Sequence, residues 1–208
     1  MKKILLLFIL FTSIQSFSQV SIGLTGGFIF HVNHYKDSLP KPSDASRFGA
    51  EIIFGIHTHW KLRTGIEYAS FSFFNRTMKQ STNDALYTYT THYLGIPIGL
   101  RYTFNEKKYT PFLDASVTFM GNIDHNTKVN TINGTSSASN GPTPNAFVLS
   151  PALGAGMLFN PANNIYLSFL MNYTMQTGYL YTALNNKQEM KHLRYNGIGA
   201  SLSVGYNF

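Results

Sequence analysis

Five charged residues are the strongest candidates for chemistry in this chain, namely Glu51, Arg63, Glu67, Arg101 and Asp114. Each lies in a segment of alternating character and falls on the side opposite to the apolar residues. Acidic and basic groups enclosed on one side would neutralise one another, and this structural role is the interpretation that we favour. A path for protons or ions along the same groups is the alternative.

A second candidate is the pair His57 and His59, which lie two residues apart on one predicted strand and therefore point to the same side. Two imidazoles so placed could share a metal ion, but a site needs a third ligand, and the spacing identifies none. We therefore expect hydrogen-bonded histidines, with no metal ion and no other cofactor.

A third possibility is an enzyme that modifies lipid A, the lipid of the bacterial outer membrane, with a serine and a histidine. Four histidines fall towards one end of the strands predicted below, the end that would face the cell exterior: His31, His34, His92 and His192. However, the chain contains no Gly-x-Ser-x-Gly nucleophile elbow, and no spacing fixes a group that would orient a base. We favour a non-enzymatic protein, with the lipid-A-modifying enzyme as the alternative.

Eight segments of alternating apolar and polar residues must position these side chains. They are Val20–Val32, Arg47–Trp60, Leu62–Asn75, Tyr89–Phe104, Tyr109–Ile123, Ala146–Phe159, Ile165–Tyr181 and Lys191–Phe208. An arginine that faces lipid near the middle of a bilayer costs about 2–4 kcal/mol. Arg101 must therefore point inward, and its neighbours Leu100 and Tyr102 must point outward.

This distribution of charge decides the kind of barrel. A soluble ligand-carrying barrel keeps apolar side chains inside and charges outside, whereas here the charges share a face with glycine, serine and threonine. After the first residues, no segment approaches the ~20 apolar residues of a membrane helix, while a strand crosses with about 10. The predicted fold is all-β, an eight-stranded antiparallel transmembrane β-barrel with up-and-down meander topology.

The predicted connections alternate between short and long. The short ones lie around Lys61 and at Asn105–Lys108 and Asn160–Asn164. The longer ones are Asn33–Ser46, Arg76–Thr88, Asp124–Asn145 and Thr182–Met190. Outer-membrane barrels have short periplasmic turns and long extracellular loops, so both termini should be periplasmic. The loop Asp124–Asn145 is rich in Asn, Thr, Ser and Gly, and it is either a binding loop or a solvated tip.

Aromatic residues gather at the predicted strand ends, where amphipathic rings favour the level of the lipid headgroups. One expected girdle is Trp60, Tyr102, Phe104, Tyr109, Phe159, Tyr206 and Phe208. The other is Tyr87, Tyr89, Tyr93, Tyr179 and Tyr181. Three prolines fall inside predicted strands, Pro97, Pro111 and Pro151, and there we expect bulges or missing ladder bonds.

The first residues have the features of a secretory signal peptide. Lys2 and Lys3 precede the apolar run Ile4–Phe11, and Ser16-Phe17-Ser18 offers a small-x-small cleavage pattern. We assign residues 1–18 to the signal peptide and 19–208 to the barrel domain. The chain has no cysteine, which excludes disulfides and thiolate metal sites.

The charge of the chain argues against nucleic acid as a partner. The formal net charge is +7, and removing Lys2 and Lys3 leaves +5, but only 12% of the residues are charged and the basic ones are scattered. No basic run exceeds two residues, so we expect no nucleic acid. A modest positive charge fits contact with the phosphates of an anionic membrane surface.

One stretch carries a family resemblance. Tyr93-Leu94-Gly95-Ile96-Pro97, followed by a polar turn and Lys108-Tyr109-Thr110-Pro111-Phe112, resembles the small outer-membrane β-barrels described as "porin family" or PorT-like. The glycine-rich first strand and the aromatic C-terminus match as well. The resemblance implies an eight-stranded outer-membrane barrel and leaves its activity open.

Tyr206 and Phe208 at the C-terminus resemble the signal that the outer-membrane assembly machinery reads. We therefore expect a monomer in the cell outer membrane, in contact with outer-membrane lipids and lipopolysaccharide. The predicted function is a structural or surface-binding role through long extracellular loops. The alternatives are the lipid-A enzyme and a narrow channel, although eight strands leave little open lumen.

Overall fold

The computed structural model of the chain is all-β in the parts that it describes. These parts are residues 19–32, 41–42, 45–77, 85–105, 107–131, 134–137, 143–162, 164–177, 181–184, 190–193 and 195–208. Within them, no helix is both long enough and apolar enough to cross a membrane. The predicted signal peptide, residues 1–18, lies outside the described residues.

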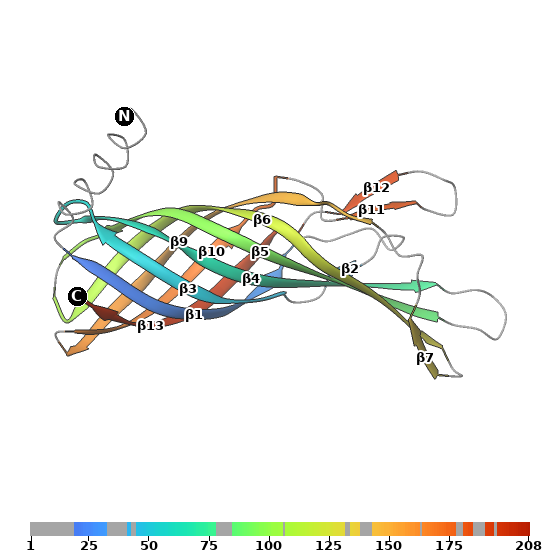
Figure 1. The fold of residues 1–208 in the computed structure, drawn as a ribbon, viewed down its shortest axis with the longest axis horizontal. Coiled ribbons are helices and arrows are strands. Elements are labelled where there is room, and N and C mark those ends of the chain that lie inside the picture. The colour runs from blue at the N-terminus through green and yellow to red at the C-terminus, as the bar shows by residue number, and fades with distance from the viewer. Residues whose placement is uncertain are drawn as a thin grey trace, which may run out of the picture.

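Eight of the described strands form the wall of a closed barrel (Figure 1). They are β1 (Val20–His31), β3 (Ala45–Gly55), β4 (Trp60–Thr77), β5 (Ala85–Thr103), β6 (Tyr109–Thr131), β9 (Phe147–Ala162), β10 (Ile165–Thr174) and β13 (Gly197–Asn207). Each pairs antiparallel with the next strand of this set, and β13 pairs with β1. The predicted eight-stranded antiparallel meander is therefore confirmed.

The remaining described strands belong to the long connections. They are β2 (Lys41–Pro42), β7 (Gly134–Ser137), β8 (Thr143–Pro144), β11 (Tyr181–Leu184) and β12 (Met190–Leu193). Strand β2 pairs with β4, and β7 pairs with β6. The other three form a small separate sheet in the order β12-β11-β8. Parts of the predicted loops are thus hydrogen-bonded hairpins.

The two ends of the barrel differ in their connections. At one end, here called the short-turn end, β3, β5 and β9 turn into the next strand over a few residues. The chain's C-terminus lies at this end (Figure 1), and the amide of Gly55 donates to the carbonyl of Gln19, the first described residue, at 2.9 Å. The hairpin of β6 with β7 and that of β11 with β12 lie at the opposite, long-connection end (Figure 1).

The turn predicted around Lys61 is misplaced. The chain turns at residues 56–59, where the amides of Ile56 and His57 donate to the carbonyl of Trp60 at 2.9 and 3.1 Å. Lys61 lies within β4 and pairs with Gly55 of β3. The position of this turn could not be predicted from the sequence, because the alternation of apolar and polar residues continues through it without a break.

Other strand ends also differ from the prediction. The strands β5 and β6 extend past the expected limits Tyr89 and Ile123, because polar residues beyond the apolar band still pair with each other. Strand β10 ends well before the predicted Tyr181, and β13 begins after the predicted Lys191. In that interval the chain forms the separate β11–β12 hairpin, which the alternation did not distinguish from the barrel wall.

The outer face of the barrel is apolar, as expected for a wall that faces lipid. On β5, Leu94, Ile96, Ile98 and Leu100 are 40–54% exposed. Their inward neighbour Arg101 is only 1% exposed. The alternation of exposed apolar and buried residues therefore has the predicted polarity.

Pro97 interrupts one side of its strand. The pairing of β4 with β5 runs through Thr64–Ile98 and resumes at Glu67–Gly95, so the two pairs between them are missing. A proline has no amide hydrogen to donate, which explains a gap at this point. This prediction is confirmed at Pro97, whereas Pro111 and Pro151 keep their register with β9 and β6.

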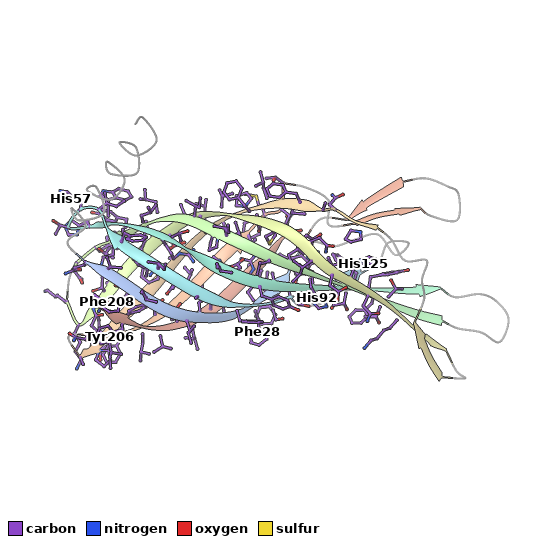
Figure 2. The ribbon with its side chains drawn as sticks, in the orientation of Figure 1. Phe28, His57, His92, His125, Tyr206 and Phe208 are labelled. Carbon is purple, nitrogen blue, oxygen red and sulfur yellow. The ribbon has the colours of Figure 1, made fainter. Side chains whose placement is uncertain are left out.

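Aromatic side chains ring the outside of the short-turn end. Exposed or half-buried rings contact one another in the pairs Trp60–Tyr102, Tyr102–Phe104, Tyr109–Phe159 and Tyr206–Phe208. Figure 2 shows the last pair at the same end of the barrel as His57. The rings are at the position expected of a girdle.

The girdle predicted at the other end is wrong for the two residues whose side chains are described, Tyr89 and Tyr93. Tyr93 is fully buried inside the barrel, because it lies eight residues before the inward Arg101 and so on the same face of β5. Tyr89 is partly buried against the same interior cluster. The side chains of Tyr87, Tyr179 and Tyr181 lie outside the described residues.

Candidate functional site

The interior of the barrel holds the predicted charged residues close together. Glu51, Arg63, Glu67, Arg101 and Asp114 are all at most 9% exposed. They come from β3, β4, β5 and β6, which are consecutive in the wall, and all face inward through the two-residue period of a strand.

Asp114 is the centre of this group. It accepts from Arg63 Nε at 3.2 Å and from Arg63 Nη2 at 2.9 Å, which is a bidentate pair. It also accepts from Arg101 Nε at 3.2 Å. Arg101 and Asp114 are directly opposite in the β5–β6 pairing. One buried carboxylate therefore serves two buried guanidinium groups.

The other two carboxylates have their own partners. Glu51 lies 4.0 Å from Arg63 Nη1 and accepts from the hydroxyl of Tyr166 at 3.0 Å. Glu67 lies 3.5 Å from Arg47 Nη1. Arg47 and Tyr166 were not among the predicted site residues. The signal for Arg47 was present, since it lies four residues before Glu51 and so on the same face of the strand.

These six charged residues form a layer that we call the ionic belt: Arg47, Glu51, Arg63, Glu67, Arg101 and Asp114. Three carboxylates face three guanidinium groups, so the belt is balanced in charge. A buried ion pair gives little net stability when it forms, but removing one partner leaves a charge uncompensated at a large cost.

Above the belt, towards the long-connection end, the interior is filled by apolar and aromatic side chains, which we call the aromatic plug. Its members are Ile29, Ala45, Ala69, Phe71, Phe73, Tyr93, Met120, Val148 and Tyr195. The ring of Tyr195 lies 5.1 Å from that of Phe71, and its hydroxyl donates to the carbonyl of Ile29 at 2.8 Å. Sequence reasoning expected a polar or ion-paired lumen and missed this plug.

The space left inside the belt is small. A cavity of about 40 Å³ lies between Arg47, Arg63 and Glu67 on one side and Leu170 and Asn172 on the other. This volume is of the order of one or a few water molecules. Towards the short-turn end, a second apolar cluster packs below the belt: Ile53, Phe112, Leu158, Tyr166 and Leu170.

The predicted histidine pair is not on a strand. His57 and His59 lie in the turn 56–59, with His57 exposed (Figure 2). His59 is half-buried, and its ring lies 5.8 Å from that of Tyr102. The expectation that both point into the lumen from one strand is therefore wrong. Among the described residues, no group of three His, Cys, Asp or Glu could hold a metal ion.

The histidines considered for an enzyme contact tyrosines. The ring of His92 stacks on Tyr68, whose hydroxyl forms a hydrogen bond with His92 Nδ1. His31 lies edge-on to Tyr195 with ring centroids 5.0 Å apart. His34 and the side chain of His192 lie outside the described residues.

A closed ring of strands with an apolar outer face and charges inside defines the class: an integral β-barrel of the outer membrane. The chain belongs to the outer membrane protein β-barrel domain family, whose model matches residues 14–208. The match is to the family as a whole and does not single out the PorT-like group. No curated protein matches the chain.

Solved structures share the fold at low sequence identity. OprG from Pseudomonas aeruginosa has a TM-score of 0.55 and 10% identity, over 91% of this chain and 95% of that one. The N-terminal barrel domain of OprF from the same organism has a TM-score of 0.48 and 13% identity, over 91% and 97%. Ail of Yersinia pestis has 0.38 and 16%, over 91% and 97%. The likeness to OprG supports the barrel fold and says nothing of activity.

Proposed function

We propose that this protein is a non-enzymatic barrel of the outer membrane whose interior is closed and whose long-connection end is presented at the cell surface. The role is structural or surface-binding. The observation that carries the proposal is the filled interior, in which the ionic belt and the aromatic plug lie one above the other.

The filled interior argues against a narrow channel. An eight-stranded barrel is just wide enough to be filled by side chains, and here the largest inward groups include Arg101, Tyr93, Tyr166, Phe71 and Phe73, all nearly or fully buried. A proton or ion path would need a continuous polar route, and the apolar plug interrupts it.

The outward residues of β5 indicate that the upper part of the β4–β5 hairpin projects beyond the membrane. From Tyr102 to Leu94 the outward residues are apolar, over nine residues, which is close to the length of a membrane-crossing strand. Beyond them the outward residues are His92, Thr90 and Thr88, all half-buried and polar. This part of the β4–β5 hairpin suits water, and Figure 1 shows it extending beyond the barrel wall together with β6.

The orientation follows from the same asymmetry. Short turns belong to the periplasmic side of outer-membrane barrels and long connections to the outside. Both termini are then periplasmic, and lipopolysaccharide surrounds the upper rim. Tyr206 and Phe208, which are 44% and 73% exposed, are suited to recognition by the assembly machinery. The protein acts as a monomer, without nucleic acid.

Two measurements test the closed, non-enzymatic barrel. The purified folded protein in planar bilayers should give no conductance above that of bilayers with an unrelated closed barrel. Steady single-channel steps would establish a channel instead. Incubation with lipid A followed by mass spectrometry should leave the acyl chains unchanged, and a change of mass would establish the enzyme.

Orientation can be tested cleanly because the chain has no cysteine. Lys128→Cys places a thiol on the exposed upper part of β6, and Lys107→Cys places one in the exposed turn at the opposite end. A membrane-impermeant maleimide should label Lys128→Cys on intact cells and Lys107→Cys only after the outer membrane is permeabilised. The reverse pattern would refute the orientation.

A further inference from the structure

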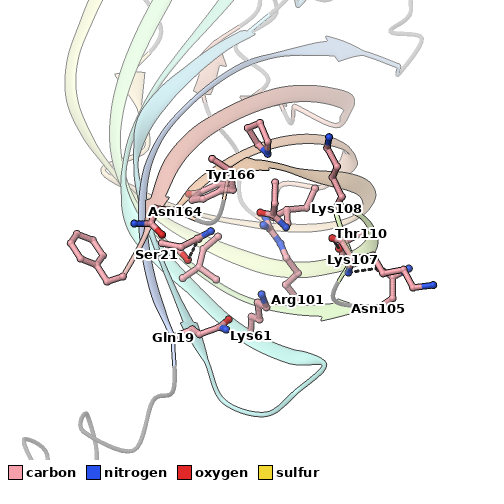
Figure 3. A pocket seen from close by; sticks show the side chains of 17 residues that line it. Gln19, Ser21, Lys61, Arg101, Asn105, Lys107, Lys108, Thr110, Asn164 and Tyr166 are labelled. Carbon is pink, nitrogen blue, oxygen red and sulfur yellow. Dashed lines mark hydrogen bonds between the residues drawn. The ribbon is translucent and has the colours of Figure 1, made fainter.

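The short-turn end of the barrel opens into a cavity of about 690 Å³ (Figure 3). Every one of the eight wall strands contributes to its lining, for example Ser21 of β1, Lys61 of β4, Thr110 of β6 and Tyr166 of β10. The cavity is therefore the mouth of the barrel, on its axis, and its volume is within the usual range for ligand pockets.

The lining of this mouth is basic. Four of its side chains are cationic: Lys61, Arg101, Lys107 and Lys108. Among the described lining residues none is Asp or Glu, and most other polar ones are amides or hydroxyls. Ammonium, guanidinium, amide and hydroxyl donors together make the donor set that binds an oxyanion.

Arg101 supplies an independent observation. Its side chain is 1% exposed, and its Cζ lies 4.1 Å from the centre of the Phe112 ring. Its Nε donates to Asp114, but its Nη1 is buried and has no hydrogen-bond partner among the described residues. A buried donor without an acceptor is unfavourable, so an oxygen of a ligand at the floor of the mouth would relieve it.

The ionic belt does not provide that acceptor. Asp114 accepts from Arg63 and from Nε of Arg101, and Glu51 accepts from Tyr166 and lies beside Arg63, yet no carboxylate of the belt forms a hydrogen bond with Nη1 of Arg101. The lysines of the mouth add positive charge on the side of Arg101 away from the belt. Lys61 lies directly opposite Arg101 in the β4–β5 pairing, so these two cations line the same side of the mouth.

We propose that this mouth binds a phosphate group, with Arg101 at its floor and Lys107 and Lys108 at its rim. Cations from three separate segments favour a multiply charged anion over a carboxylate. Because the cavity lies inside the ring of strands, the geometry favours a water-soluble phosphomonoester over the headgroup of a surrounding lipid, which would have to reach round the rim. The proposal does not depend on whether the barrel conducts ions.

Calorimetric titration of the folded full-length protein in a non-ionic detergent tests the proposal, with inorganic phosphate and glycerol phosphate as probes. Both should bind, and added sodium chloride should weaken the binding by screening. The double variant Lys107→Ala, Lys108→Ala should weaken it by roughly tenfold or more, the scale expected for losing two charged partners at a partly exposed site. The matched control Lys128→Ala, at the other end of the barrel, should bind as the wild type does.

Arg101→Lys keeps the positive charge and removes Nη1. It should weaken binding although the charge is unchanged, and a heat-dependent shift in gel mobility will show that the variant is folded. Absence of binding by the wild type, or an equal loss with Lys128→Ala, would overturn the proposal.

The source of the phosphate is decided in a second arm, with the protein in phosphatidylcholine nanodiscs with and without phosphatidylglycerol. If the anionic lipid leaves the affinity for glycerol phosphate unchanged, the ligand is water-soluble. If it competes, the soluble ligand is refuted and the site belongs to a lipid headgroup.

Discussion

The barrel interior contains two contrasting layers. The ionic belt of paired charges lies in the lower half, nearer the short-turn end, and the aromatic plug lies in the upper half, nearer the long-connection end. In the lower half, a wall that faces lipid encloses the ionic belt. Around the aromatic plug, the outward side chains of β4 and β5 include polar ones such as Ser72 and Thr90, whereas Phe28, Phe119 and Phe147 keep the outer face of β1, β6 and β9 apolar. Strand β4 contains both patterns: Ile66 points outward beside the inward Glu67, while further along Ser72 points outward between the inward Phe71 and Phe73.

On β4 and β5 this inversion indicates that the plug and the belt are stabilised differently. Where water reaches the outer side of these two strands, burying aromatic side chains inside is favourable, as in a soluble protein. Where lipid surrounds the wall, an apolar interior gains much less, because the outside is equally apolar. Paired charges can then fill the lumen and fix the register of the strands.

Removing the shared carboxylate should have the largest effect. Asp114→Asn leaves Arg63 and Arg101 without their common counter-charge, and we expect a loss of about 3–5 kcal/mol in the free energy of unfolding. Urea titration of the protein in lipid vesicles measures it, with the fluorescence of the single tryptophan, Trp60, as the probe. Asp124→Asn, at an exposed site, should change it by less than about 0.5 kcal/mol. Equal effects would show that the belt is not structural.

Truncating a side chain of the aromatic plug should have the second-largest effect on the free energy of unfolding. Phe71 is fully buried, and Phe71→Ala should cost about 3 kcal/mol by loss of burial and creation of a cavity. Phe74, on the outward side of the same strand, is 39% exposed, and its replacement by alanine should cost less than half as much. The same urea titration compares the two. If Phe71→Ala lowered the free energy of unfolding no more than Phe74→Ala does, the stability of the upper half would not depend on the aromatic plug.

A charge on the outer face should separate the lipid-facing wall from its rim. Ile98→Arg places a guanidinium near the middle of the apolar band and should cost about 2–3 kcal/mol. Tyr109→Arg, in the aromatic girdle at the short-turn end, should cost about 0–1 kcal/mol. If both positions tolerated arginine equally in vesicles, the wall at Ile98 would not face lipid.

The smallest effect is expected at the turn of the short-turn end. His57 is exposed, so His57→Ala should change the free energy of unfolding by less than about 0.5 kcal/mol. Urea titrations with and without added Zn²⁺ should coincide for both proteins. Stabilisation of the wild type by zinc that disappears in His57→Ala would revive the metal hypothesis.

The sequence predicted the barrel well because membrane burial imposes a strong constraint on each strand. The cost of a lipid-facing arginine was enough to orient Arg101, and the two-residue period then placed Glu51, Arg63, Glu67 and Asp114 on the inward side. Those five residues lie inside. The alternation does not predict which inward residues contact each other, because those contacts depend on the register between neighbouring strands around the barrel.

The plug was missed for a related reason. Alternation distinguishes inside from outside only while the outside is apolar. Above the membrane the pattern of Phe71-Ser72-Phe73 inverts, and an inward aromatic residue is then easily taken for a member of a girdle, as Tyr93 was. The serine on the outward side was the available signal. The turn at 56–59 gave no such signal, since its residues continue the alternation.

The seam between β1 and β13 has a consequence for biogenesis. It joins residues at opposite ends of the chain, from Ser21–Asn207 to His31–Gly197. No partial product lacking the last strand can close, so β1 keeps an open edge that can pair with foreign strands until translation has finished. The ring therefore closes only through the wall contact of largest sequence separation, between the first strand and the last, which is the kind of contact that slows folding.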